Sequence, residues 1–313
     1  MTRHPQLLSA EVGKPVLHQV LLLLVAMIWG LNFVSASLAL EDVPVWIFRV
    51  VTFGGGAVIL FAVTLTRRIA LLPPRRRDLI HLTVAGFFGV AGFGALSALA
   101  LLHTSVGRAS ICVYLMPVWV ALLGRVILKE RLGRARILAI LIGVTGLVIL
   151  MYPLLSAGEM TGVLAATGAG ISWAIGTIYL KWAKVPAHPL MITVWHLAVA
   201  ALVSAVGIVI WQQNWPSEIS SSAWAGLVFT TVMGTAAAYL IWFNLVTRLP
   251  ASTAGLGTLL VPVFGLLAAM VLLAEQPTVA DTFGLALVLT AGLLTLMARP
   301  FTPSVPAKPG TSH

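Results

Sequence analysis

Residues 105–132 read SVGRASICVYLMPVWVALLGRVILKERL, an apolar run with Pro117 near its middle and charged residues toward its ends. Residues 253–278 repeat this pattern as TAGLGTLLVPVFGLLAAMVLLAEQPT, with Pro262 in the place of Pro117. A proline inside a helix removes one backbone donor and crowds the preceding turn, so each copy is predicted to be a kinked helix. We expect the two kinks to lie close together and to act in gating.

Further positions repeat in the same order along the whole chain. The matched residues lie 144 to 146 positions apart and are Trp29 and Trp173, Pro44 and Pro189, Pro117 and Pro262, Glu130 and Glu275, Gly146 and Gly292, and Met151 and Met297. One match would carry no weight, whereas six in order at a near-constant spacing indicate an internal duplication.

The composition is that of an integral membrane protein. Residues of the AVILMFWYC set make up 59% of the 313, only 9% are charged, and the mean hydropathy is +1.03. A bilayer core about 30 Å thick requires roughly 20 apolar residues per helix. Charges, prolines and polar clusters divide the chain into ten such runs, at residues 16–40, 43–66, 79–102, 105–128, 134–153, 160–182, 188–212, 221–247, 250–273 and 280–298. Runs of this length exclude a barrel of short strands, so the predicted fold is all-α.

The ten predicted transmembrane helices fall into two five-helix repeats, residues 16–153 and residues 160–298. Five is an odd number, so the second repeat enters the membrane in the opposite orientation. Inverted repeats of this kind are typical of secondary transporters, whose substrate site lies near the bilayer midplane between the halves.

Lys and Arg gather in alternate connections of these helices. Residues 67–78 hold five and residues 125–136 another five, while only Arg108 falls on the opposite side. The positive-inside rule therefore predicts that both termini are cytoplasmic. Residues 1–15 are then a short cytoplasmic segment, and the proline-rich residues 299–313 are predicted to be disordered. The same distribution explains the net charge of +10 better than nucleic-acid binding does.

Two sets of motifs identify a family resemblance. The first repeat carries Trp29, Gly30 and Asn32, and then Ala109-Ser110, Leu115-Met116-Pro117-Val118 and Lys129-Glu130-Arg131-Leu132. The second carries Pro250-Ala251-Ser252, Val261-Pro262-Val263 and Ala274-Glu275-Gln276, where the family more often has Gly-Glu. With these motifs the chain resembles the drug/metabolite transporter superfamily, EamA type, over nearly its whole length. The resemblance implies a multi-pass exporter of the inner (plasma) membrane. Within the superfamily the chain is similar to exporters of amino acids and related metabolites, including YddG-like aromatic amino-acid exporters, and no residue separates these subfamilies.

The sequence shows no signature of catalysis, and we predict no catalytic residue, metal site or cofactor. It contains no His-Glu-x-x-His, Gly-x-Ser-x-Gly or Walker motif and no His/Cys cluster at ligand spacing. All nine acidic residues fall in predicted loops, tails or span ends, so no intramembrane carboxylate is available as a proton relay. Uniport or exchange is the simpler prediction. Glu130 and Glu275 are interpreted as caps of the helices that follow them, with a gating role as the alternative.

Aromatic and small polar residues in mid-span are the candidate substrate-binding groups. Trp29 and Asn32 are three residues apart on one helical face, and Trp173 and Thr177 repeat the arrangement in the second half. An indole offers a flat apolar surface with one donor, which suits a partly apolar cargo. The alternative is plain lipid contact, but interfacial Trp belts lie at span ends.

Hydroxyl groups and a second aromatic pair extend this candidate site. Tyr114 precedes the Pro117 kink by three residues, Tyr239 and Trp242 share one face of the eighth span, and Ser97 supplies a hydroxyl on the third. Each can instead serve as a hydrogen-bonding contact between packed helices. The single cysteine, Cys112, is interpreted as a small buried apolar residue.

Two basic side chains lie well inside predicted spans. Arg49 is about 9 Å from the external end of its span at 1.5 Å per residue, close enough to reach outward to Glu41 or Asp42. The alternative is that Arg49 binds a cargo carboxylate. His196 is interpreted as a neutral, hydrogen-bonded histidine rather than a proton carrier.

The sequence thus predicts a secondary transporter that exports small amphipathic metabolites, foremost amino acids, by alternating access. The alternatives are a broad-specificity exporter of drugs or toxic metabolites, an intramembrane enzyme, and a receptor without transport. A small-molecule substrate and the lipid bilayer are the predicted partners, and a monomer is sufficient for this mechanism.

Overall fold

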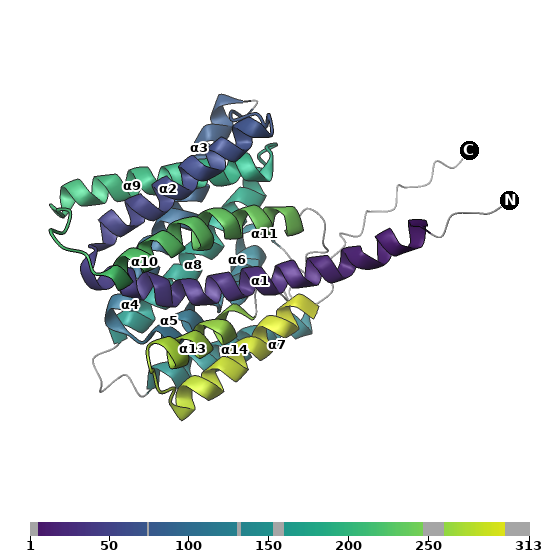
Figure 1. The fold of residues 1–313 in the computed structure, drawn as a ribbon. Helices are drawn as coiled ribbons and strands as arrows, with labels where there is room; N and C mark the ends of the chain where they lie inside the picture. The colour runs from purple at the N-terminus through teal and green to yellow at the C-terminus, as the bar shows by residue number, and fades with distance from the viewer. Residues whose placement is uncertain (1–5, 74, 130–132, 153–159, 247–259, 298–313) are drawn as a thin grey trace, which may run out of the picture.

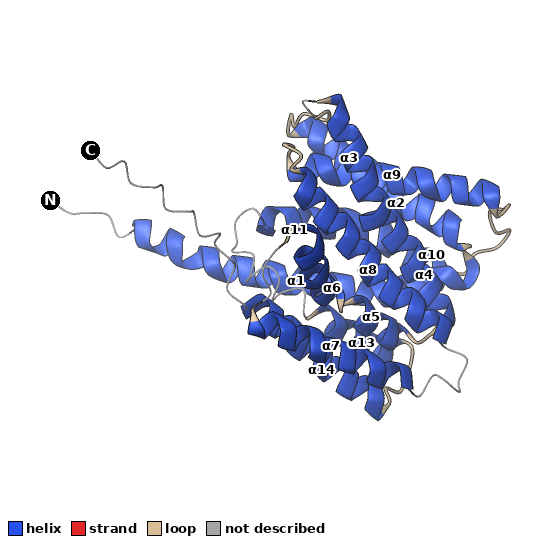
Figure 2. Cartoon of the chain, turned by 180° about the vertical axis from the view of Figure 1, so that it is seen from behind, coloured by secondary structure: helices blue, strands red, loops and turns tan. Residues whose placement is uncertain are grey.

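The computed structural model describes residues 6–73, 75–129, 133–152, 160–246 and 260–297, and within these ranges every regular element is a helix (Figures 1 and 2). The elements are α1 (Gln6–Asp42), α2 (Val45–Thr66), α3 (Arg76–Gly86), η1 (Phe87–Gly92), α4 (Phe93–His103), α5 (Val106–Val113), α6 (Met116–Ile127), α7 (Arg134–Met151), α8 (Met160–Ala183), α9 (Pro189–Ile210), α10 (Ser221–Phe229), η3 (Thr230–Ala237), α11 (Ala238–Val246), α13 (Val261–Leu272) and α14 (Val279–Met297). The prediction of an all-α fold is confirmed for this part of the chain.

Helix lengths agree with a membrane-spanning bundle. In the described ranges seven helices, some of them made of consecutive elements, are long and apolar enough to cross a bilayer, and three more apolar helices are shorter. Many large apolar side chains point outward, for example Val271 at 80% exposure and Val209 at 76%, as expected where lipid is the solvent. Residues 250–259 of the predicted span 250–273, together with residues 299–313, lie outside the described residues. Helix α1 begins at Gln6, ahead of the predicted start at residue 16.

Helices that the duplication pairs as equivalents pack against each other in antiparallel fashion. At one side of the molecule α2 meets α9, with Trp46 near Gly207 at one end and Gly56 near Leu197 at the other. At the opposite side α7 meets α14 (Figure 1), and there Gly143 lies against Ala291. In both pairs residue numbers rise on one helix as they fall on its partner.

The remaining helix contacts follow the same scheme. Helix α8 packs on α3 and α4, and α1 packs on α10 and α11, which match α3 and α4 by sequence; α8 also packs on α6, as α1 packs on α13. Likewise α2 contacts η3 while α9 contacts η1. Closest approach depends on small residues: a Cβ on Gly176 of α8 would lie 2.4 Å from the backbone nitrogen of Gly89 in η1.

The helix predicted to kink at Pro117 is instead broken just before it. Helix α5 ends at Val113, Tyr114 and Leu115 form a turn, and α6 begins at Met116. Pro117 therefore lies in the first turn of α6. Backbone N–H groups of a first turn have no acceptor within the helix, so a proline there costs no hydrogen bond. Pro262 occupies the first turn of α13 in the same way. The span is therefore interrupted at Tyr114 and Leu115, two to three residues before Pro117, and not at the proline itself. The residues next to each proline, Val118 and Val261, share one buried cluster.

Two π-helical segments interrupt equivalent spans. Segment η1 lies between α3 and α4, and η3 lies between α10 and α11. Their first residues, Phe87 and Thr230, are 143 positions apart, close to the spacing of the sequence repeat. A π-helical turn shifts the hydrogen-bond ladder and re-aims the side chains and carbonyls that follow it, and such turns are frequent at functional sites. Nothing in the sequence pattern predicted them.

Candidate functional site

Trp29, Tyr239 and Trp242 form one aromatic cluster between α1 and α11. The Trp29 ring centroid lies 6.1 Å from that of Tyr239 in an edge-to-face arrangement and 5.5 Å from that of Trp242. The indole Nε1–H of Trp29 donates to the Gly234 carbonyl over 3.2 Å. Such ring pairs at 4.5–7 Å are attractive beyond simple burial. The structure thus brings together three predicted site residues from opposite halves of the chain.

Asn32 joins this cluster through η3. Its side-chain Oδ1 is buried with no hydrogen-bond partner, and a Cβ on Gly234 would lie only 2.0 Å from that atom. Gly234 is therefore needed so that the Asn32 amide can approach the η3 backbone. A buried amide oxygen without a donor is costly and is a place where a ligand donor can be accepted.

Arg49 points into the protein and not outward. Its side chain is 7% exposed, its Nη2 donates to the Ser97 hydroxyl of α4 over 2.9 Å, and its Nε has no partner. The guanidinium carbon lies 4.8 Å from the ring centroid of Phe48 and 5.3 Å from that of Phe53. The interpretation that Arg49 reaches Glu41 or Asp42 is wrong, because the side chain lies on the α2 face that packs against α4.

Tyr239 links this arginine to the rest of the cluster. It packs on the buried cluster that contains Phe53, the ring beside Arg49, and its own ring contacts that of Trp29. Tyr114 is buried at the break between α5 and α6 and packs its ring 6.2 Å from that of Phe33 on α1. Cys112 is buried in the same core, as predicted. Residues from α1, α2, α4, α5 and α11 therefore converge on one buried region.

The equivalents in the second half, Trp173 and Thr177, lie on α8. Trp173 is half-buried and, at 100° per residue, lies on α8 between Gly170, which faces α5, and Gly176, which faces η1. The Thr177 hydroxyl donates to the Trp173 carbonyl of its own helix over 2.9 Å. His196 packs against Gly86, and its Nε2 is buried without a hydrogen-bond partner, so the predicted hydrogen bond is absent at that nitrogen.

Glu275 is a helix cap, but of a different helix from the one predicted. Its two carboxylate oxygens accept the backbone N–H groups of Val106 and Gly107 over 2.7 and 3.0 Å. These are free amides at the start of α5, in the other half of the chain, where the helix dipole also favours a negative charge. The sequence pointed to α14 because that helix follows Glu275 directly. Glu130, its counterpart, lies outside the described residues.

A buried ion pair stands next to this cap. Arg108 on α5 donates from Nε and Nη2 to the two oxygens of Asp281 on α14, over 2.8 and 3.1 Å. Asp281 also accepts from the backbone and hydroxyl of Thr278, each over 2.8 Å, and so completes the first turn of α14. These contacts join α5 to α14 across the two halves.

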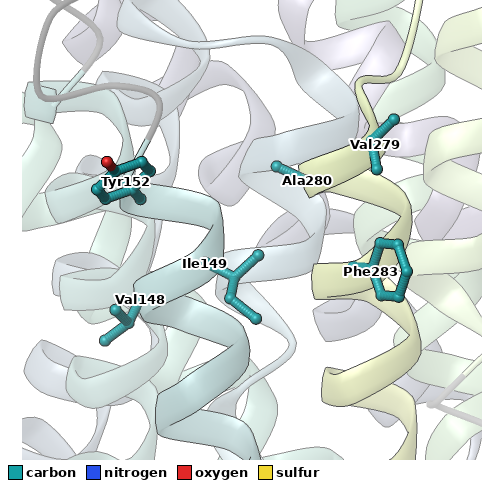
Figure 3. Close-up of a pocket in the computed structure, with 6 residues that line it drawn as sticks. All are labelled: Val148, Ile149, Tyr152, Val279, Ala280 and Phe283. Atoms are coloured by element: carbon teal, nitrogen blue, oxygen red, sulfur yellow. The ribbon is translucent and has the colours of Figure 1, made fainter.

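Two surface pockets lie away from the aromatic cluster. One, of about 520 Å³, lies between α7 and α14 and is lined by Val148, Ile149, Tyr152, Val279, Ala280 and Phe283 (Figure 3). Its lining is apolar and outward-facing, with Tyr152 at 75% exposure, so lipid chains are its natural contact. The other, of about 250 Å³, includes Arg108, Asp281 and Glu275, which already have partners: Arg108 and Asp281 pair with each other, and Glu275 accepts from the start of α5.

Sequence reasoning missed three contributors to the buried region. Phe33 follows Asn32 by a single position and reaches Tyr114, while Phe48 and Phe53 flank Arg49. Aromatic residues near an intramembrane arginine were a usable signal, because rings attract guanidinium groups. The role of Gly234 had no such signal, since it depends on the π-helical turn.

Comparison with known proteins decides the family. The model of the EamA-like transporter family matches residues 17–152 and matches again at residues 160–297. The chain belongs to the EamA-like transporter family. With the apolar helices of the structure, this makes it a multi-pass membrane protein. The EamA relatives described below are named as transporters or efflux pumps, in agreement with the prediction that the chain is not an enzyme.

Several EamA relatives match over most of their length. The uncharacterized transporter YoaV of Bacillus subtilis is 24% identical over 86% of this chain and 92% of its own. A probable amino-acid metabolite efflux pump of Escherichia coli is 25% identical over 87% and 92%, and one of Salmonella typhimurium 26% over the same shares. One solved crystal structure superposes with a TM-score of 0.64 over 91% of this chain and 99% of that one at 23% identity, which shows that the fold is shared.

Proposed function

We propose that this EamA protein exports small amphipathic metabolites, foremost amino acids, across the inner (plasma) membrane. The observation that carries the proposal is the cluster of three partly buried rings, Trp29, Tyr239 and Trp242, near the buried Arg49, with residues from both halves of the chain. Rings beside a single cation suit a molecule with an apolar body and a charged end. The efflux pumps of Escherichia coli and Salmonella among the relatives support the same cargo class.

The transport cycle we propose is alternating access by two inverted five-helix repeats. The antiparallel contacts of α2 with α9 and of α7 with α14 support this layout, because equivalent helices of an inverted repeat run in opposite directions. The turn at Tyr114 and Leu115, just before Pro117, divides this span into α5 and α6 and is the point at which the two segments would bend relative to each other. With ten spans in this arrangement both termini are cytoplasmic.

We further propose that transport is uniport or exchange. Among the described residues the buried carboxylates, Asp78 and Asp281, stand in the first turns of their helices, and Asp281 is held by Arg108 and Thr278. A carboxylate fixed by an arginine is a poor proton carrier, since the positive partner favours the ionised form.

Counterflow in proteoliposomes tests this function. Vesicles loaded with unlabelled amino acid are diluted into labelled amino acid, over a panel of amino acids, with and without a pH gradient. Accumulation that ignores the gradient is expected, and strict dependence on the gradient refutes uniport or exchange. If no amino acid of the panel is exchanged while bulky organic cations are, the cargo is instead that of a broad-specificity drug exporter.

Substitutions of the two repeated tryptophans test the site. Trp29→Ala and Trp173→Ala are expected to reduce counterflow at least tenfold while the protein stays folded in detergent. Trp215→Ala is the matched control, because this indole lies in the loop after α9 and is 52% exposed. Counterflow at the wild-type rate in both Trp29→Ala and Trp173→Ala would remove the assignment of these residues to the site.

A further inference from the structure

Two arginines of this protein are buried to the same degree but have very different partners. Arg49 and Arg108 are each 7% exposed. Arg108 donates two hydrogen bonds to the carboxylate of Asp281. In the described part of the chain Arg49 forms no ion pair and donates only to the neutral hydroxyl of Ser97, while its Nε–H remains unpaired. The positive charge of Arg49 is therefore not neutralised.

An uncompensated charge within a membrane span is costly, and such residues are retained where they serve function. The nearest acidic residues in sequence do not relieve it, because Glu41 is exposed and Asp42 accepts from the backbone and hydroxyl of Ser220. Phe48 and Phe53 offer ring faces to the guanidinium, but a ring carries no net charge. What Arg49 lacks is an anion.

The surroundings of Arg49 also fix its orientation. The Ser97 hydroxyl accepts from Nη2 and donates to the Gly94 carbonyl over 3.1 Å, so the serine itself is held in place. A Cβ on Gly94 would lie 2.4 Å from the Phe53 ring, so this glycine leaves room for the ring beside the guanidinium. The guanidinium plane is thus held before any ligand arrives, which is the condition for a geometrically selective hydrogen bond.

We propose that Arg49 binds the carboxylate of the transported molecule and that the protein therefore selects carboxylates over the matching amides and amines. This rests on the proposed export function and names the chemical group by which the cargo is recognised. A carboxylate accepts the free Nε–H in a charge-assisted bond and supplies the missing negative charge. Ser97 acts as a positioning residue, and the rings of Trp29 and Tyr239 contact the apolar part of the cargo.

Ligand binding to the purified protein in detergent tests the proposal without transport. The probes are 3-phenylpropanoate and L-phenylalanine, which carry a carboxylate, and L-phenylalaninamide and phenethylamine, which do not. A ligand that binds only the folded state stabilises it by RT ln(1 + [L]/Kd), so the rise of the thermal midpoint with ligand concentration yields a dissociation constant. We expect the two carboxylates to bind and the amide and amine to bind at least tenfold more weakly.

Variants assign the effect to Arg49. Arg49→Gln is expected to weaken carboxylate binding about 10- to 100-fold, the range for loss of a charge-assisted hydrogen bond. Arg49→Lys keeps the charge but lacks the planar fork of the guanidinium. Its affinity for carboxylates should lie between those of the wild type and Arg49→Gln. Ser97→Ala should weaken binding by a smaller factor. Arg125→Gln removes one positive charge at an exposed position of α6 and should leave binding unchanged.

Each outcome separates this proposal from the proposed function. Equal binding of acid and amide, carboxylate binding unchanged in Arg49→Gln, or no binding of either carboxylate overturns the role of Arg49, even if counterflow of amino acids is observed. Arg49-dependent binding of 3-phenylpropanoate in a protein that exchanges no amino acid supports the role of Arg49 and refutes the amino-acid cargo. If Arg49→Gln without ligand has a lower thermal midpoint than the wild type, the carboxylate affinity of Arg49→Lys is compared with that of the wild type instead.

Discussion

The ion pair between Arg108 and Asp281 makes the sharpest stability prediction, and the perturbation is Asp281→Asn. The two side chains are only 9% and 5% exposed, and the arginine donates two bonds to the carboxylate over 2.8 and 3.1 Å. The asparagine has nearly the same size but no charge, and the NH2 group that replaces one carboxylate oxygen donates hydrogen bonds and cannot accept them. Arg108 then remains buried beside a neutral partner.

The expected loss follows from that geometry. Removing one member of a buried ion pair costs about 3–5 kcal/mol, because the desolvation of the remaining charge is no longer offset. Asp281 also accepts two bonds from Thr278 at the start of α14, and losing such a cap adds about 1 kcal/mol. Typical net stabilities are about 5–15 kcal/mol, so the variant should be visibly less stable.

Unfolding by guanidinium chloride in detergent micelles, followed by tryptophan fluorescence, measures this loss. Replacing Arg108 by Met in the same chain should recover part of it, because no buried charge is then left unpaired. The control is Asp42→Asn, which removes an exposed carboxylate that caps α10 through Ser220 and should cost less. A loss below about 1 kcal/mol for Asp281→Asn, or a double variant whose loss equals the sum of the single losses, would refute the reasoning.

Three further substitutions have equally definite outcomes. Gly176→Ala places a methyl group 2.4 Å from the Gly89 backbone, which is less able to move than a side chain. The free energy of unfolding should therefore fall by about 1–3 kcal/mol in the same assay, and wild-type stability would show that α8 can move away. Gly234→Ala should displace the Asn32 side chain and so reduce counterflow. The thermal midpoint should change little, because Asn32 Oδ1 accepts no hydrogen bond that could be lost. Unimpaired counterflow would remove Asn32 from the site. Glu275→Gln keeps an acceptor at the start of α5 but loses the charge, so the free energy of unfolding should fall by about 1 kcal/mol. An unchanged free energy of unfolding would contradict the role of Glu275 as a cap.

Local sequence identified several side chains of the candidate site correctly as neighbours. Trp29 and Asn32 were grouped by helical spacing, and both contact Gly234 in the structure. Tyr239 and Trp242 were grouped in the same way and both pack on Trp29. A shared helical face is a local property, so spacing alone predicts it. The link between the two groups was not predictable from spacing, because it depends on how α1 and α11 are rotated toward each other.

The sequence by itself determined that this is a helical membrane protein with an internal repeat and that it resembles EamA transporters. Hydropathy reports the solvent that each segment meets, and in lipid a helix satisfies its own backbone, so the element type follows from composition alone. Only the tertiary structure decided the partners of the charged groups. Arg49 turned inward to Ser97, and Glu275 capped α5 and not the helix that follows it. Such partners depend on which helices lie side by side and at what rotation, and that is set by packing between residues far apart in the chain.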